Sequence, residues 1–145
     1  MVCLGVGGSS LGAKTLCALA APPAAGERPR LHFMDNIDPD SFAVLFGAID
    51  PARTGFIVTS KSGATAETLT QFLIALDWMR SALPGVPLGD HFTIITQPGP
   101  RPLRRLAEEF AMTILDHDAN IGGRYAGLIV VGLLPALSAG LDGEA

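Results

Sequence analysis

Short apolar runs alternate along the chain with longer segments in which apolar residues recur every three or four positions. The short runs predict five buried strands, at residues 2–6, 31–34, 56–59, 92–96 and 112–115. The longer segments have the spacing of helices with one apolar face. Strands that alternate with helices form parallel sheets covered on both faces. The pattern therefore predicts a single α/β domain, a three-layer α/β/α sandwich around a five-stranded parallel sheet.

Two of the expected helices have recognisable ends. Asp38 followed by Pro39 is typical of an N-cap and a first helical residue. The segment 65–83 has a helical pattern and is followed by Pro84, which ends it. Its apolar residues are expected to form one buried stripe, made of Leu69, Phe72, Leu73, Leu76 and Met79.

Residues 125–141 contain no charged side chain, so a membrane span has to be considered. The segment is shorter than the ~20 residues needed to cross a bilayer, and it contains Pro135. We therefore expect a buried helix here and no membrane partner. The first residues contain no basic region followed by an apolar signal core, so the sequence does not support secretion.

Two loops between a predicted strand and the next helix are rich in glycine and hydroxyl side chains. They have the sequences GVGGSS, at residues 5–10, and SKSGATAET, at residues 60–68. Small residues let backbone N–H groups approach an anion, and the helix that follows presents free amides and a positive dipole end. Lys61 adds a positive charge to the second loop. Both loops are therefore candidates for binding a phosphate group.

The expected strand order is the flavodoxin-like 2-1-3-4-5, in which the first and third strands are neighbours. The two loops follow these two strands. Ligands of such sheets bind where the chain reverses its direction of travel across the sheet, beyond the carboxyl ends of the strands. This order would therefore combine the two loops into one phosphate site.

Two better-known phosphate motifs fit the first loop poorly. A nucleotide-hydrolysing loop needs lysine directly after its last glycine, whereas Ala13 separates Gly12 from Lys14. The dinucleotide fingerprint meets Ser10 where its third glycine belongs, although Asp35 could still contact a ribose. A dinucleotide site thus stays open as an alternative, while nucleotide hydrolysis is disfavoured.

Composition narrows the class of partner and the compartment. The formal net charge is −4 and 17% of the residues are charged, without a basic run, which argues against nucleic-acid binding. Cys3 and Cys17 lie in a predicted strand and helix, where free cysteines behave as small apolar residues. A reducing, cytoplasmic location is expected.

Four segments occur in this order along the chain: GVGGSSLGAKTL, DNIDPDSF, VTSKSGATAET and NIGGRYAGL. In order and separation they resemble the sugar-isomerase (SIS) domain of the glucose-6-phosphate isomerase family, and the resemblance covers almost the whole chain. The stretch SKSGATAET resembles a family signature, and GGR, at residues 122–124, matches the family's catalytic-arginine motif.

This resemblance implies an enzyme of carbohydrate metabolism that interconverts glucose 6-phosphate and fructose 6-phosphate. It also implies that neither a metal nor an organic cofactor is needed and that the full-length enzyme is a homodimer. Arg124 corresponds to the arginine beside the reacting carbons. The substrate-phosphate site corresponds to Gly8, Ser9, Ser60, Lys61, Ser62 and Thr65.

Other polar residues are weaker candidates for chemistry. Glu67 could act as a base, but a carboxylate in a first helical turn is more often there to stabilise the helix dipole. His117 lies between Asp116 and Asp118 without further metal ligands nearby in the sequence, so a solvated loop is expected.

The family's catalytic glutamate, ring-opening histidine and further lysine have no counterpart in this sequence. The chain is therefore expected to be one SIS-type domain, residues 1–145, of a longer isomerase, incomplete by itself. Ala126 stands where the family often has serine. Two alternatives remain open, a non-catalytic phosphosugar-binding module and an isomerase that acts on another sugar phosphate.

Overall fold

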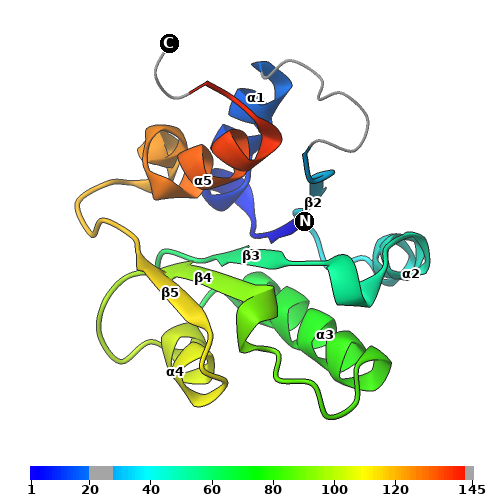
Figure 1. Cartoon of the computed structure of the whole chain (residues 1–145). Coiled ribbons are helices and arrows are strands. Elements are labelled where there is room, and N and C mark those ends of the chain that lie inside the picture. Colours follow the sequence, from blue (N-terminus) through cyan, green and yellow to red (C-terminus); the bar gives the residue numbers. More distant parts are fainter. Residues whose placement is uncertain (20–27, 143–145) are drawn as a thin grey trace.

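The computed structural model describes residues 1–19 and 28–142. This part of the chain forms a five-stranded sheet in the order β2-β1-β3-β4-β5 (Figure 1), and all neighbouring strands are parallel. The strands are β1 (Val2–Leu4), β2 (His32–Met34), β3 (Phe56–Thr59), β4 (Phe92–Thr96) and β5 (Thr113–Asp116). The predicted parallel sheet and its strand order are confirmed.

The end of β1 and the start of β5 differ from the predicted limits because of local hydrogen bonds. β1 ends two residues earlier than predicted because Val6 is already the N-cap of a short 3-10 helix. β5 begins one residue later than predicted, because the Met112 N–H still donates to the Ala107 carbonyl at 2.8 Å. β3 and β4 have the predicted limits.

Helices cover both faces of the sheet. The α-helices are α1 (Leu11–Leu19), α2 (Pro39–Ala48), α3 (Ala66–Ala82), α4 (Pro102–Glu109) and α5 (Val130–Ala139). The 3-10 helices are η1 (Gly7–Ser9), η2 (Pro51–Arg53), η3 (Gly89–His91) and η4 (Gly123–Leu128). α1 and α5 lie on one face of the sheet, and α3 and α4 lie on the other (Figure 1). The three-layer α/β/α arrangement is therefore confirmed.

The predicted start of α2 is also confirmed. The Asp38 carboxylate accepts a hydrogen bond from the Ser41 N–H at 2.8 Å, and Pro39 occupies the first turn. The side chain satisfies one of the free amides at the helix end, and proline needs no donor there.

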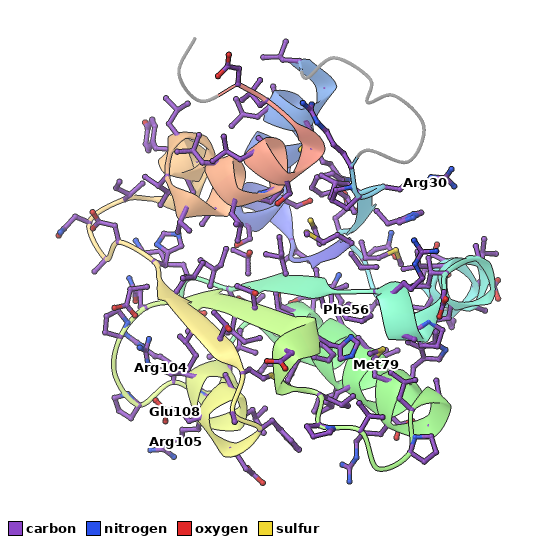
Figure 2. The ribbon with its side chains drawn as sticks, viewed as in Figure 1. Arg30, Phe56, Met79, Arg104, Arg105 and Glu108 are labelled. Atoms are coloured by element: carbon purple, nitrogen blue, oxygen red, sulfur yellow. The ribbon has the colours of Figure 1, made fainter. Side chains whose placement is uncertain are left out.

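The face of the sheet toward α3 and α4 is packed with large side chains, and we call it the aromatic face. Phe56 stacks on Phe92 with ring centroids 4.8 Å apart, and Phe72 meets Phe92 edge-on at 5.6 Å. Figure 2 shows Phe56 and Met79 between the sheet and α3, and both side chains are buried. Burying such side chains supplies most of the stability of a domain of this size.

The opposite face, which we call the small-residue face, is covered by α1, η4 and α5. Its buried residues are smaller and fewer, namely Cys3, Ile57, Ile95, Ala126 and Val131. A Cβ atom added to Gly12 of α1 would lie 2.6 Å from the Gly127 Cα of η4. The packing of α1 on η4 therefore requires glycine at that contact, because no side chain fits between the backbones.

The predicted stripe of α3 is only partly correct. Phe72, Leu76 and Met79 are buried, but Leu73 is 49% exposed. Gln71 is fully buried instead, and its amide donates to the Met34 and Asn36 carbonyls at 3.1 and 2.8 Å. The helix is rotated so that Gln71 faces the end of β2, where these carbonyls provide partners for a buried amide.

The apolar segment 125–141 is not one buried helix. It begins within η4 and continues as α5, whose residues Val131 and Ala136 are buried while Leu137 is 49% exposed. In the described part of the chain, none of the helices combines the length and apolar character of a membrane span.

Candidate functional site

The two candidate phosphate loops leave the sheet next to each other. β1 pairs with β3, and Leu4 lies opposite Val58 in the parallel register. A Cβ atom added to Gly5, directly after β1, would lie 3.0 Å from the Thr59 carbonyl oxygen at the end of β3. The two loops therefore share one edge of the sheet, as the predicted strand order requires.

The loop after β1 reaches across to the segment before Arg124. Gly7 has a positive φ of 55°, which suits glycine, and the Ser10 N–H donates to its carbonyl at 3.0 Å. A Cβ atom added to Gly8 would lie 2.5 Å from the Gly123 carbonyl oxygen. Gly8 is thus required by a close backbone contact, which brings the first loop and η4 together.

Three hydroxyl groups gather in the loop after β3. The Ser60 hydroxyl donates to the Thr65 hydroxyl at 3.0 Å, and the Ser62 hydroxyl lies 3.4 Å from the same atom. Thr65 is the N-cap of α3 but makes no side-chain capping bond. The first amides of α3 are therefore not capped by this side chain, and the hydroxyls can rotate to donate to an anion.

Gly63 sets the shape of this second loop. Its φ is 63°, and an added Cβ atom would lie 2.7 Å from the Cβ of Arg101 and 2.8 Å from the Thr96 hydroxyl. Both the backbone conformation and the surrounding space exclude a side chain at this position. The sequence pattern alone indicated a glycine-rich loop but not which neighbours enclose it.

Lys61 connects the second loop to the segment that follows β5. Its ammonium group donates to the Ala119 carbonyl at 2.9 Å and to the Ile121 carbonyl at 2.8 Å. An ammonium group has three donors, so one N–H remains for a ligand. The assignment of Lys61 to phosphate binding remains a prediction, and the structure adds a second role that the sequence pattern did not indicate.

Arg124 lies in η4, two residues after Gly122, and is exposed. Within residues 1–19 and 28–142 its guanidinium has no hydrogen-bond or ion-pair partner. The contacts of Lys61 and Gly8 bring its segment to both candidate phosphate loops. All seven predicted site residues therefore lie in three adjoining loops at the carboxyl edge of the sheet.

Two buried hydroxyls at this edge are not among the substrate-binding residues predicted from the sequence. Ser10 and Thr96 are 3% and 0% exposed, and neither hydroxyl has a hydrogen-bond partner among the residues that the structure describes. Thr96 ends β4 beside Gly63, and Ser10 closes the first loop. Ser10 belongs to the glycine-rich pattern and could have been included, whereas only the fold brings Thr96 to the site.

Asp35, which the dinucleotide alternative would use, pairs with Lys14 of α1. The hydrogen bond from Lys14 is the main cause that lowers the pKa of Asp35 below its usual value of 3.8. The ion pair links the end of β2 to α1. Asp35 therefore has a structural role that needs no ribose.

The expectation that His117 lies in a solvated loop was wrong. His117 is 2% exposed, and its Nδ1 lies 2.8 Å from the Asp118 carbonyl. The backbone N–H of His117 donates to the Thr96 carbonyl. This bond extends the pairing of β4 and β5 by one residue and directs the His117 side chain into the protein.

Glu67 is exposed in the first turn of α3, as the dipole explanation expects. Within the described ranges, no three His, Cys, Asp or Glu side chains form a group able to hold a metal ion.

The opposite edge of the sheet also contains a cavity, of about 650 Å³, between the end of α3 and the end of α4. It is lined by residues 83–88 and 109–111 together with Arg80. These segments precede β4 and β5, so the cavity is separated from the three loops by the length of the strands. Its lining combines apolar residues with one arginine and one glutamate and contains no hydroxyl groups.

Curated relatives are similar to nearly the whole chain. A glucose-6-phosphate isomerase from Rubrobacter xylanophilus is 39% identical over 148 residues, covering 98% of this chain. One from Thermus thermophilus is 36% identical over 144 residues, covering 99% of this chain. Each alignment covers 34% of the relative, so the chain spans about a third of the length of these relatives.

Solved structures agree with this similarity. A hypothetical protein from Thermus thermophilus superposes with a TM-score of 0.87 at 38% identity, covering 97% of this chain and 33% of that one. A glucose-6-phosphate isomerase from Chlamydia trachomatis superposes with a TM-score of 0.70 at 31% identity, covering 90% and 24%. The family model described as phosphoglucose isomerase matches residues 1–144. The chain belongs to the phosphoglucose isomerase family.

Proposed function

We propose that this chain is the SIS-type phosphosugar-binding domain of a glucose-6-phosphate isomerase. The reaction interconverts glucose 6-phosphate and fructose 6-phosphate through an enediolate. The observation that carries the proposal is the junction of the hydroxyl-rich loop after β3 with the segment that carries Arg124, through the Lys61 ammonium group. Family membership supports the substrate class, and the junction supports a phosphate site beside Arg124, whose guanidinium has no partner among the described residues.

The phosphate group of the substrate would bind at the two glycine-rich loops. Hydroxyls of Ser9, Ser60, Ser62 and Thr65 and the backbone at Gly8 provide donors, and the amino end of α3 provides a positive potential. The sequence pattern also predicts Lys61 as a phosphate ligand, but the Ala119 and Ile121 carbonyls take two of its three N–H groups. Holding the substrate by its non-reacting end lets binding energy position the carbons that react.

Arg124 would stabilise the charge that develops during isomerisation. When a proton leaves the carbon next to a carbonyl, negative charge grows on oxygen, and a fixed guanidinium stabilises it without losing its own proton. Its lack of partners within the described residues is consistent with this role, since a ligand would be its first strong acceptor. Arg124 is therefore the proposed catalytic residue of this chain.

The proton-transferring groups would come from outside this sequence. The relatives are about three times as long, and we propose that the base and the ring-opening group belong to the remainder. Without a positioned base, proton abstraction slows by roughly 10²- to 10⁴-fold, so the chain alone would bind substrate with little turnover. A homodimeric full-length enzyme in the cytoplasm belongs to the same proposal, and the two free cysteines support the reducing location only.

Calorimetric titration of the 145-residue chain with fructose 6-phosphate tests this proposal. We expect saturable binding that inorganic phosphate competes away, and no binding of fructose, which lacks the phosphate group. Equal affinity for fructose, or no affinity for any sugar phosphate, would contradict the proposal.

Turnover distinguishes the two remaining alternatives. Isomerase activity restored by adding the complementary segment of a relative supports the enzyme. Binding without activity in that mixture favours a non-catalytic module. Tighter binding of another aldose phosphate or ketose phosphate favours a different isomerase.

A further inference from the structure

We propose that Lys61 is a positioning residue, which holds the Arg124 segment in place for the reaction. The inference rests on the proposed function and adds to it, since it assigns to Lys61 a role other than phosphate binding. The observation behind it is that the Lys61 ammonium binds two carbonyls of the segment before Arg124, those of Ala119 and Ile121.

The lysine is itself held at a fixed place. Its carbonyl accepts a hydrogen bond from the Gln97 N–H at 3.1 Å, which ties the loop backbone to the residue after β4. The preceding residue, Ser60, donates its N–H to the Ile95 carbonyl at 3.0 Å. The ammonium group therefore extends from a backbone that the sheet already anchors.

The segment that Lys61 contacts has mostly local hydrogen bonds of its own. The Asn120 N–H donates to the Asp118 carboxylate at 2.8 Å, and the Ile121 N–H reaches the Asp118 carbonyl at 3.4 Å. These bonds shape the turn but do not attach it to the sheet. The bonds from Lys61 do so, and they are strong because the donor is charged.

The segment after this turn is held from a second side. Gly122 and Gly123 lead to Arg124, and Gly123 lies against Gly8 of the first loop. The Lys61 side chain and the Gly8 backbone, which both support the arginine segment, thus come from the two loops proposed to bind phosphate. Lys61 and Gly8 together place Arg124 relative to the bound substrate.

Hydrogen exchange of the ligand-free chain tests the attachment itself. In Lys61→Met, amides of residues 118–123 should exchange about ten-fold faster or more, because losing even one of the two charge-assisted hydrogen bonds accounts for about that factor. Lys61→Gln should restore part of the protection, because a neutral amide can still donate to both carbonyls. The control is Lys14→Met, which removes the charge paired with Asp35 and should leave these amides unchanged. Unchanged exchange in Lys61→Met would overturn the proposal.

A double-mutant cycle tests whether Lys61 acts through Arg124. Lys61→Met and Arg124→Met should each lower the affinity for a phosphorylated sugar acid, whose carboxylate mimics the charge of the enediolate, and the double variant should lose little more than Arg124→Met alone. Affinity for inorganic phosphate should change less than two-fold in Lys61→Met. Additive losses, together with a matching loss of inorganic phosphate, would instead make Lys61 a direct phosphate ligand and overturn the inference.

The proposed function and this inference fail differently. If the unmodified chain binds neither fructose 6-phosphate nor inorganic phosphate, the proposed function is wrong, and the positioning role in that reaction is wrong with it. If binding occurs but the cycle is additive, only the role of Lys61 is wrong. Thermal unfolding of each variant shows that the compared proteins are folded.

Discussion

The two faces of the sheet differ in how they are packed and in what they hold. The aromatic face buries Phe56, Phe72 and Phe92 in direct ring contacts. The small-residue face relies on contacts between glycines and leaves large apolar side chains exposed, among them Leu11, Leu19, Leu128 and Leu137. Since η1 and η4 belong to the second face, the proposed site residues Gly8 and Arg124 are held by the face with fewer large buried side chains. One face therefore supplies most of the stability, while the other positions the proposed site.

The largest effect is expected from the aromatic face. Phe72→Ala should lower the free energy of unfolding by about 3–5 kcal/mol, since a fully buried ring is replaced by a cavity. Leu128→Ala, on the small-residue face, should change it by no more than about 0.5 kcal/mol because this side chain is 76% exposed. Urea unfolding followed by circular dichroism measures both values. Similar losses for the two variants would remove the difference between the faces.

A glycine substitution separates placement from stability. Gly8→Ala should weaken fructose 6-phosphate binding by about ten-fold or more, because the added methyl group meets the Gly123 carbonyl and separates the two loops. Gly47→Ala is the matched control, since nothing lies within 4 Å of an added Cβ atom. It should leave binding unchanged and stabilise α2 by up to about 1 kcal/mol. Calorimetry and thermal unfolding measure the two effects, and an equal loss of binding in both variants would contradict the role of Gly8.

The two cysteines report on opening of the small-residue face. Burial, with a smaller contribution from Cys17, raises the pKa of Cys3 to about 12, and burial also raises the pKa of Cys17. At pH 8 Cys17, which is only partly buried, should react with a thiol reagent first. Cys3 should react only when this layer opens, at a rate that rises in mild denaturant. Equal rates for the two thiols, measured by mass spectrometry of single-cysteine variants, would mean that the layer gives no protection.

The smallest effect is expected at the Lys14–Asp35 pair, which is exposed. The folded state has the lower pKa for Asp35, so the pair contributes stability above the unfolded value of 3.8 and loses it as the pH falls through the folded value. Asp35→Asn should cost less than about 1 kcal/mol at pH 7, and this difference should vanish in acid. Unfolding curves at several pH values check the sign, and a difference that grows in acid would contradict it.

Features set by a few neighbouring residues could be predicted from the sequence. The capping of α2 by Asp38 and the limits of β3 follow from local chemistry, and the parallel sheet follows from the alternation of strands and helices. The strand order was assumed from the flavodoxin-like arrangement, and the structure confirms it. The sequence also identified the two glycine-rich loops. Their adjacency then followed from the predicted pairing of β1 with β3.

Features that depend on distant partners could not be predicted. Gln71 is buried because β2 presents two carbonyls to it, and His117 is buried because β4 pairs with the residue beyond β5. The contacts of Lys61 join residues 58 and 60 positions apart along the chain. None of these partners is visible in a local pattern, so the sequence placed Leu73 by helical spacing, His117 by its charged neighbours and Lys61 by its loop.

The most direct test of the central claim is an NMR titration of the 145-residue chain with fructose 6-phosphate, followed through its backbone amides. The account predicts that the shifts concentrate at Gly8, Ser9, residues 60–65 and residues 122–124, at the carboxyl edge of the sheet. Shifts centred instead on residues 83–88 and 109–111, around the cavity at the opposite edge, would contradict it.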